Sequence, residues 1–248
     1  MTASWFVTTD GTLVPAVTAE EMREVDRIAI EETGPNLYQM MENAGRSLAA
    51  TGIDLLGPAW RGSSVVVLAG TGGNGGGGIC AARHIANRGG QVSVVITDQS
   101  RLRPVPAQQL AIYQGTAGEL PRPGDVASLD PLLIIDALIG YSLSGPPRGP
   151  ARELIEWAGS SGARCLSLDV PSGIDSTSGE AFGAHITADQ TMTLALPKTG
   201  LDVDAVGDLL LADIGIPAEV YRRAGIEVPS GPFGDGLIVP IGVAETDR

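Results

Sequence analysis

Short runs of β-branched and aliphatic residues recur along the chain, separated by segments with apolar residues at helical spacing. The run Val65 to Ala69 is followed by a segment, Gly70 to Gly78, in which seven of nine residues are glycine. A helical pattern then continues to about Arg88. Uninterrupted apolar runs of this length are typical of parallel strands covered on both faces. We therefore expect a strand, a glycine-rich turn and a helix.

Further strands, mostly separated by helical patterns, are predicted at 92–97, 132–135, 165–168, 191–196 and 209–212. Earlier in the chain, Thr18 and Glu21 have the spacing of a capping box that opens a helix, and Gly34-Pro35 separates it from a second one. Strands that alternate with helices indicate right-handed βαβ units. The fold class predicted is α/β: a three-layer α/β/α sandwich, Rossmann-like, with a mostly parallel central sheet.

The 248 residues are enough for one large α/β domain with a full core. No linker or internal repeat is visible, so we predict a single domain over 1–248 with its core at about 17–225. Residues 1–16 are expected to be a loosely attached lead-in, with Trp5 and Phe6 packed on the surface. The proline- and glycine-rich segment from Val228 onward is predicted to be an irregular tail.

A net charge of -13 argues against nucleic acid or an anionic membrane surface as a partner. No apolar run reaches the length of a membrane span, and no secretory signal is visible. Cys80 and Cys165 lie in apolar segments, so we expect two buried thiols in a reducing compartment and a cytoplasmic protein.

Polar residues that carry chemistry follow several of the predicted strands. The glycine-rich turn, Asp136, Asp169 and Lys198 each come at or just after the end of a strand. In parallel sheets these ends meet at one edge, where ligands bind. A helix that begins after a glycine-rich turn also presents free N–H groups to an anion such as a phosphate. We therefore predict one site formed by these four features.

Two nucleotide-binding motifs can be weighed against this turn. A P-loop is excluded, because no Lys-Ser/Thr pair closes the turn. The spacing of Gly70, Gly72 and Gly75 matches G-x-G-x-x-G, with Asp98 where a ribose-binding acid would stand. This match keeps a nicotinamide-dependent dehydrogenase as a minor alternative, because such spacings arise easily in a chain with 34 glycines.

Several motifs occur in order along the chain: Met41-Glu42-Asn43-Ala44-Gly45, Gly70 to Gly78 with Ala81-Ala82-Arg83-His84, Asp136-Ala137-Leu138-Ile139-Gly140, Asp169-Val170-Pro171-Ser172-Gly173-Ile174-Asp175, Pro197-Lys198 and Asp213-Ile214-Gly215-Ile216-Pro217. From about Val17 to Pro217 the chain thereby resembles the NAD(P)H-hydrate epimerase family, whose domain is also called the YjeF N-terminal domain. The resemblance implies interconversion of the R and S forms of hydrated NADH and NADPH, which carry a hydroxyl at C6 of the reduced ring. It also implies a homodimer and a functional link to a separate dehydratase that restores the cofactor.

The resemblance assigns roles to individual residues. A potassium ion would be held by Asn74, Asp136 and Ser172, which offer the oxygen ligands that a hard cation prefers. Asp169 and Lys198 would be the catalytic acid–base groups near C6. The dinucleotide-like substrate would contact Asp169 and two loops, comprising Gly73, Asn74, Gly75, Gly76, Gly77, Gly140, Tyr141, Ser142, Leu143, Ser144, Gly145 and Pro146.

The chain departs from the family pattern in both loops. The family usually has Asn-Asn-Gly-Gly-Asp-Gly where this chain has Gly73 to Gly78, and Gly-Thr-Gly-Leu where it has Gly140-Tyr141-Ser142-Leu143. Gly73 and Gly77 thus remove two polar side chains, and Tyr141 adds a large one. Two alternatives therefore stand beside the epimerase: an enzyme that catalyses a different small-molecule reaction in the same pocket, and a non-catalytic binding or scaffold module.

Overall fold

The computed structural model describes residues 5–229 and 231–244. Its strands are β1 (Trp5–Thr8), β2 (Leu13–Pro15), β3 (Ser64–Ala69), β4 (Gln91–Ile96), β5 (Leu133–Ala137), β6 (Arg164–Leu168), β7 (Gln190–Leu194), β8 (Asp208–Ala212) and β9 (Ile238–Val243). The α-helices are α1 (Ala19–Ile28), α2 (Leu37–Leu56), α3 (Gly73–Ala86), α4 (Pro104–Tyr113), α5 (Gly149–Ser160) and α6 (Ala218–Arg223). A π-helical turn follows α1 at Ala29–Thr33, and short 3₁₀ turns lie at Gly57–Gly62, Gln99–Arg101, Pro123–Ser128 and Asp204–Val206.

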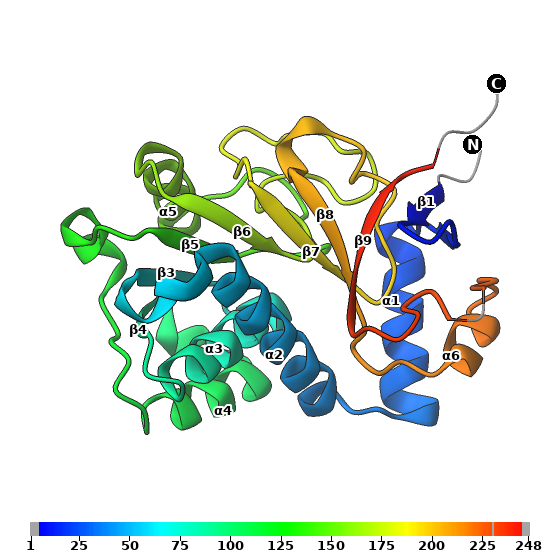
Figure 1. Ribbon diagram of the computed structural model, residues 1–248, viewed down its shortest axis with the longest axis horizontal. Helices are drawn as coiled ribbons and strands as arrows, with labels where there is room; N and C mark the ends of the chain where they lie inside the picture. The colour runs from blue at the N-terminus through cyan, green and yellow to red at the C-terminus, as the bar shows by residue number, and fades with distance from the viewer. Residues whose placement is uncertain (1–4, 230, 245–248) are drawn as a thin grey trace.

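All nine strands form one sheet with the order β2-β1-β9-β8-β7-β6-β5-β3-β4 (Figure 1). The strands from β4 to β8 pair in parallel, and β9, β1 and β2 extend the sheet by antiparallel pairs. The chain leaves β3 toward β4 on one side and returns to β5 on the other. The order of the strands therefore reverses between β3 and β5, which is where open α/β sheets bind ligands.

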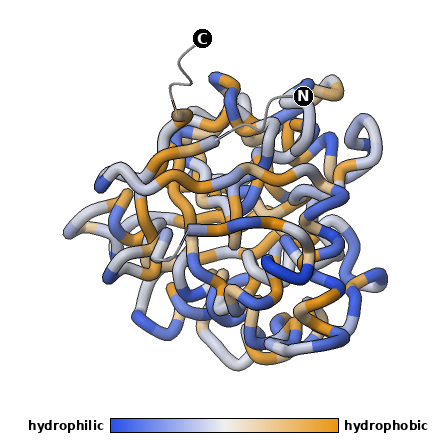
Figure 2. Tube along the Cα trace, turned by 90° about the vertical axis from the view of Figure 1, so that its right-hand side faces the viewer, coloured by the Kyte–Doolittle hydropathy of each residue, from blue (hydrophilic) through white to orange (hydrophobic). Residues whose placement is uncertain are grey.

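Helices cover both faces of the sheet, as the three-layer prediction requires. Strand β3 alternates between them: Val65 and Val67 join the large core that includes residues of α1 to α4, whereas Val66 and Leu68 pack with Leu154 of α5. Figure 2 shows apolar stretches running through the interior of the molecule and hydrophilic stretches mostly at its edge. The Rossmann-like, mostly parallel α/β architecture is confirmed, and α5 is the one α-helix of the described residues in the second outer layer.

Local sequence explains how the first two helices begin. Thr18 and Glu21 form the predicted capping box of α1, and Asn36 and Gln39 form a second one at the start of α2. In each box a side-chain oxygen accepts a hydrogen bond from a free backbone N–H of the first turn. Between them, the Gly34-Pro35 bond is cis and interrupts the helical path.

Both chain ends differ from the prediction. Residues 5–15 form β1 and β2 rather than a loose lead-in, and Phe6 is 1% exposed rather than packed on the surface. The predicted irregular tail contains β9, which lies between β1 and β8. The prediction failed because these strands are short and join the sheet only through the pairing of β1 with β9, which lies at the other end of the chain. Residues 1–4 of the predicted lead-in and residues 230 and 245–248 of the predicted tail lie outside the described residues.

Some inner strand boundaries also differ from the prediction by one or two residues. Strand β7 ends at Leu194 rather than Leu196, because Ala195 has a φ of 64° and turns the chain out of the strand. Helix α4 begins at Pro104, since proline is well tolerated in the first helical turn, where its N–H would be unpaired. Within the described residues, each helix is too short or too polar to cross a lipid bilayer.

Candidate functional site

A cavity of about 590 Å³ opens at the carboxyl edge of the parallel strands. Residues of α1, α2 and the starts of α3 and α4 form part of its wall, and the segments that follow β5, β6, β7 and β8 also line it. Its lining is largely apolar, with residues such as Met22, Met40 and Met41, and the polar groups lie among these apolar walls. This combination is typical of a small-molecule site.

The cavity contains a buried ion pair. Lys198 Nζ donates to Asp169 Oδ1, to the Leu194 carbonyl at 2.9 Å and to Thr193 Oγ1 at 3.4 Å. The side chains of Lys198 and Asp169 are 1% and 5% exposed. Asp169 also has a φ of 70°, an uncommon backbone conformation for a residue with a side chain. Such conformations concentrate at functional sites, where the surrounding structure maintains them.

Asp136 and Ser172 meet just beneath the cavity wall. Ser172 donates to Asp136 through Oγ at 2.6 Å and through its backbone N–H at 2.8 Å. Ser167 Oγ and the Leu138 N–H complete four hydrogen bonds to this carboxylate. Complete burial raises the pKa of Asp136, and these hydrogen bonds oppose that shift. The carboxylate fixes the turn after β6, and therefore the backbone next to Asp169.

Asn74 lines the same cavity, and its side-chain amide has an unsatisfied hydrogen-bond donor. Its Nδ2 atom is buried and has no hydrogen-bond partner among the described residues. Gly140 lies close to it: a Cβ atom added at Gly140 would be 3.0 Å from Asp169 Oδ2 and 3.2 Å from Asn74 Oδ1. A glycine is needed at position 140 because Asn74 and Asp169 approach its backbone from two sides.

A second carboxyl group, Asp26, enters the cavity from α1. Its Oδ2 accepts a 2.6 Å hydrogen bond from the hydroxyl of Tyr141. The backbone N–H of Tyr141 donates to Asp169 Oδ2 at 3.0 Å, and the Tyr141 ring centroid lies 5.9 Å from Lys198 Nζ. Burial raises the pKa of Asp26, while the Tyr141 hydrogen bond and the Lys198 charge oppose the shift. Tyr141 thus stands between the two carboxyl groups.

The model of the family described as YjeF-related protein N-terminus matches residues 37–200. The chain belongs to this family. A relative from Dehalogenimonas lykanthroporepellens named NAD(P)H-hydrate epimerase is 47% identical over 97% of this chain and 98% of its own length. A relative of the same name from Weissella koreensis is 36% identical over 85% of this chain and 96% of its own.

A longer relative and a solved structure complete the comparison. A bifunctional NAD(P)H-hydrate repair enzyme from Hyperthermus butylicus is 42% identical over 85% of this chain, which spans only 40% of that relative. The crystal structure of yeast ynu0 is similar in fold, with a TM-score of 0.80, 24% identity, and coverage of 91% of this chain and 99% of that one.

In this YjeF-related domain, the structure divides the predicted substrate-binding residues into groups. Gly73, Asn74, Gly140, Tyr141, Ser142 and Asp169 line the cavity, and so does Lys198. The remaining loop residues, Leu143, Ser144, Gly145 and Pro146, line a shallower neighbouring cavity of about 390 Å³ that also includes Ser142. Asp136 and Ser172 contact each other directly, and no hydrogen bond joins either of them to Asn74 among the described residues.

The other predicted contacts, Gly75, Gly76 and Gly77, are buried inside the first turns of α3. A Cβ atom at Gly75 would be 1.9 Å from the Gly70 carbonyl oxygen, and one at Gly77 would be 2.8 Å from Leu168 Cδ2. Gly73, by contrast, has nothing closer than Met41 Cε at 4.0 Å. Gly75 and Gly77 therefore allow α3 to pack closely against the turn after β3 and against β6, and only Gly73 and Asn74 of this run line the cavity.

Sequence reasoning missed several cavity residues. Asp26 lies in a helix whose pattern indicates only an amphipathic core face, so nothing local distinguishes it from a solvated carboxylate. The exposed cations Arg23 and Arg103 also line the cavity. Conversely, Asp98 caps the 3₁₀ turn at Gln99–Arg101 through Ser100 and does not line the cavity. Asp98 thus offers no support for a dehydrogenase.

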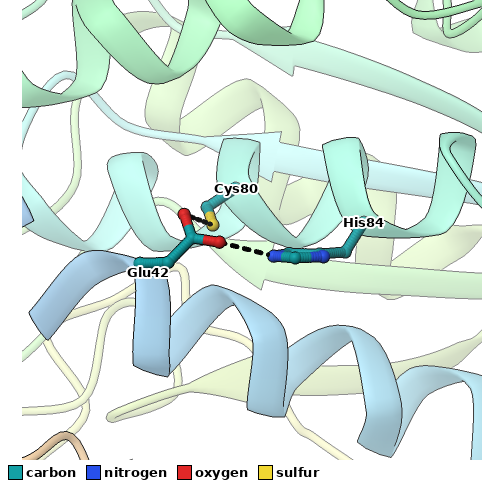
Figure 3. A group of neighbouring side chains, drawn as sticks. All are labelled: Glu42, Cys80 and His84. Atoms are coloured by element: carbon teal, nitrogen blue, oxygen red, sulfur yellow. Dashed lines mark hydrogen bonds and ion pairs between the residues drawn. The ribbon is translucent and has the colours of Figure 1, made fainter. Parts of the chain in front are cut away.

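A separate polar cluster joins α2 to α3. Glu42 accepts from Arg83 and lies 2.8 Å from His84 Nε2, with Cys80 Sγ 3.4 Å from its other oxygen (Figure 3). Burial opposes ionisation of Glu42, but the hydrogen bonds from Arg83 and His84 outweigh it and lower the pKa of this carboxyl to about 2. Glu42 therefore stays ionised and joins α2 to α3 through its ion pair with Arg83.

Glu42, Cys80 and His84 lie close enough together to bind a metal ion, but the Arg83 side chain occupies the position between two of them. The Arg83 guanidinium contacts Glu42 and also lies 3.2 Å from Cys80 Sγ. Burial raises the pKa of the Cys80 thiol to about 12 and so disfavours the thiolate in this arrangement. The cluster is therefore a structural link that fixes α3, and with it Asn74, against α2.

Proposed function

We propose that the protein interconverts the R and S forms of hydrated NADH and NADPH. The observation that carries this proposal is the match to the epimerase of Dehalogenimonas lykanthroporepellens, at 47% identity over 97% of the chain. The cavity supports it, because Asp169, Lys198 and Asn74 lie together in a mostly apolar pocket at the sheet edge. A pocket of about 590 Å³ accommodates the hydrated nicotinamide half of such a substrate.

Epimerisation at C6 requires the bond between C6 and the hydroxyl oxygen to break and to form again on the other ring face. The electron pair of the bond leaves with the oxygen, the ring nitrogen forms an iminium, and the hydroxyl takes up a proton and departs as water. Water then adds to the opposite face and loses a proton. No electrons are exchanged with a cofactor, and proton-transfer groups of the protein are sufficient for both steps.

Asp169 is the carboxylate best placed to exchange a proton with this water. Its two oxygens are held by Lys198 and by the Tyr141 N–H, which fixes the direction of the carboxylate. The Lys198 ammonium donates to three protein oxygens. In the proposed mechanism Lys198 therefore orients Asp169 and balances its charge, and Asp169 transfers the proton.

A potassium ion belongs to the same proposal. Asn74, Asp136 and Ser172 would hold it, because amide, carboxylate and hydroxyl oxygens suit a hard cation. When bound, the ion would supply positive charge that offsets the substrate phosphates in an acidic protein. The proposal further includes a homodimer and cooperation with a separate dehydratase. A cytoplasmic location is supported by Cys80 and Cys165, which are unpaired buried thiols.

The test supplies one purified epimer of hydrated NADH or NADPH and follows the appearance of the other by chromatography, against a reaction without protein. The same reaction in ¹⁸O-labelled water should place the label on C6 of the product. Absence of conversion above the uncatalysed rate would contradict the proposed function. Conversion without label would retain the function and reject the water-loss route.

A further inference from the structure

Epimerisation by loss and re-addition of water needs a proton transfer on each face of the ring. One group must protonate the departing hydroxyl, and a second must deprotonate the water that adds from the other side. A single carboxylate fixed on one face serves only one of these events. The proposed function therefore requires a second proton-transfer group in the cavity, in addition to Asp169.

Most titratable side chains that line the cavity do not qualify. Lys198 directs its ammonium toward protein oxygens that occupy its donors. Arg23 and Arg103 remain protonated at any physiological pH. Tyr141 already donates its hydroxyl proton to Asp26, and burial raises the pKa of this phenol further. Among the described residues, Asp26 is left.

We propose that Asp26 is a second catalytic carboxyl group, which exchanges a proton with the C6 oxygen on the ring face opposite to Asp169, and that Tyr141 positions it. This inference rests on the proposed epimerase function. Asp26 comes from α1 and Asp169 from the end of β6, so the two carboxyl groups reach the cavity from separate elements. Tyr141 contacts both, through its hydroxyl and its backbone N–H.

The hydrogen bonds leave Asp26 able to react. Tyr141 occupies Oδ2, and no described residue donates to Oδ1, which can therefore face a ligand in the cavity. The Tyr141 hydroxyl has no other role in the hydrogen bonds of the described residues. The usual family pattern has a Thr where this chain has Tyr141, and a Thr side chain is too short to reach the Asp26 carboxylate as the Tyr141 hydroxyl does. The hydrogen bond to Asp26 therefore depends on the tyrosine of this chain.

The charges around Asp26 favour proton exchange nearer to neutral pH than for an ordinary carboxyl. Burial raises its pKa above 3.8, the Tyr141 hydrogen bond and the Lys198 charge lower it, and the Asp169 charge raises it, with a raised pKa as the net result. Tyr221 of α6 also faces Asp26, and Arg23 of α1 lies on the cavity wall nearby. The protonated form of Asp26 is therefore more populated than for a solvated carboxyl.

The proton balance closes without a further reactant. In one direction, the Asp26 carboxylic acid gives its proton to the departing hydroxyl, which leaves as water, and Asp169 takes a proton from the water that adds. In the reverse direction the two carboxyl groups exchange roles. Exchange of protons with solvent water after product release returns both groups to their starting states.

The experiment measures kcat and KM for epimer conversion with wild type, Asp26→Asn and Asp54→Asn. Asp54 lies near the exposed end of α2, so it provides a matched substitution outside the cavity. We expect Asp26→Asn to lower kcat on the order of 10²-fold or more, with KM changed only a few-fold. Asp54→Asn should behave like wild type. An Asp26→Asn protein that keeps more than half of the wild-type kcat would overturn the inference while leaving the proposed function intact.

Tyr141→Phe provides a second arm that does not depend on whether Asp26→Asn folds. Loss of the hydrogen bond that lowers the pKa of Asp26 should move the Asp26-dependent limb of the kcat–pH profile to higher pH. An unchanged profile in a folded Tyr141→Phe protein would overturn the inference. A wild-type protein without any epimer conversion would overturn the proposed function, and this inference with it.

Discussion

At the scale of single residues, Lys198 and Asp169 form a buried ion pair, with 1% and 5% of their side chains exposed. Two charges in such a place depend on each other, because either one alone is left buried without compensation. The pair therefore links folding stability to the chemistry of the cavity, and the two effects can be separated by substitution.

Asp169→Asn should lower epimerase activity on the order of 10²-fold or more, because an amide does not exchange the proton. It should also destabilise the fold by about 3–5 kcal/mol, since the Lys198 ammonium stays buried without its counter-charge. Activity assays and denaturant unfolding measure the two effects separately. The double variant Asp169→Asn/Lys198→Met serves as the control: it should regain much of the stability and none of the activity. A single variant as stable as wild type would show that the two charges are not coupled.

Asn74 allows a test of the proposed potassium site. Its buried Nδ2 has no protein partner, so Asn74→Ala should change stability in the absence of potassium by less than about 1 kcal/mol. Wild type should unfold at a higher temperature in potassium chloride than in choline chloride of equal concentration, because an ion that binds only the folded state stabilises it. Asn74→Ala should lose this difference. Equal unfolding temperatures of wild type in the two salts would count against the site.

At the scale of elements, α3 lies close to the sheet because several of its first residues lack a side chain. A Cβ atom at Gly75 would be 1.9 Å from a backbone carbonyl oxygen that has no room to move. Glu42 and Arg83 then hold the same helix against α2. These contacts fix the start of α3, which is the part that carries Gly73 and Asn74 into the cavity.

A pair of alanine substitutions tests this account of α3. Gly75→Ala should destabilise the protein by about 1–3 kcal/mol or more, because the added methyl group forces the helix away from Gly70 in the turn after β3. Gly73→Ala should be neutral or stabilising by up to about 1 kcal/mol, because its surroundings are open and alanine favours helix. Denaturant unfolding measures both. Similar stabilities for the two variants would mean that close packing does not explain the glycine at position 75.

At the scale of the whole molecule, β9 joins the first strands of the chain to the parallel sheet. It pairs with β8 on one side and with β1 on the other, so residues from both ends of the chain complete one edge of the sheet. The last described strand is therefore part of the cooperative fold.

Two residues on the same face of β9 differ in burial, because Val243 is the last residue of the strand. Ile241 is 8% exposed and Val243 is 45% exposed. Ile241→Ala should cost about 2 kcal/mol or more in the free energy of unfolding, because it removes buried methyl groups and leaves a cavity. Val243→Ala should cost under about 0.5 kcal/mol. Thermal and denaturant unfolding give these values, and equal small losses would indicate that β9 does not contribute to the core.

The sequence by itself determined the parallel part of the sheet, and with it the position of the site. Apolar runs such as 65–69 and 165–168 are strands because only a doubly covered sheet buries them, and the residues that follow must meet at one edge. This local logic was enough to select the glycine-rich turn, Asp136, Asp169 and Lys198, whereas Ser172 came only from the family resemblance. The motifs added the family, which the match over residues 37–200 confirms.

Tertiary structure alone decided the rest, because the deciding contacts join segments that are distant in the sequence. The carboxyl group of Asp26 enters the cavity only because α1 packs beside the loop that carries Tyr141, 115 residues away. The glycines of α3 are required by a carbonyl and a side chain that lie against them, and β9 becomes a strand only between β1 and β8. A pattern read along the chain contains local preferences, whereas these features depend on which surfaces folding brings together.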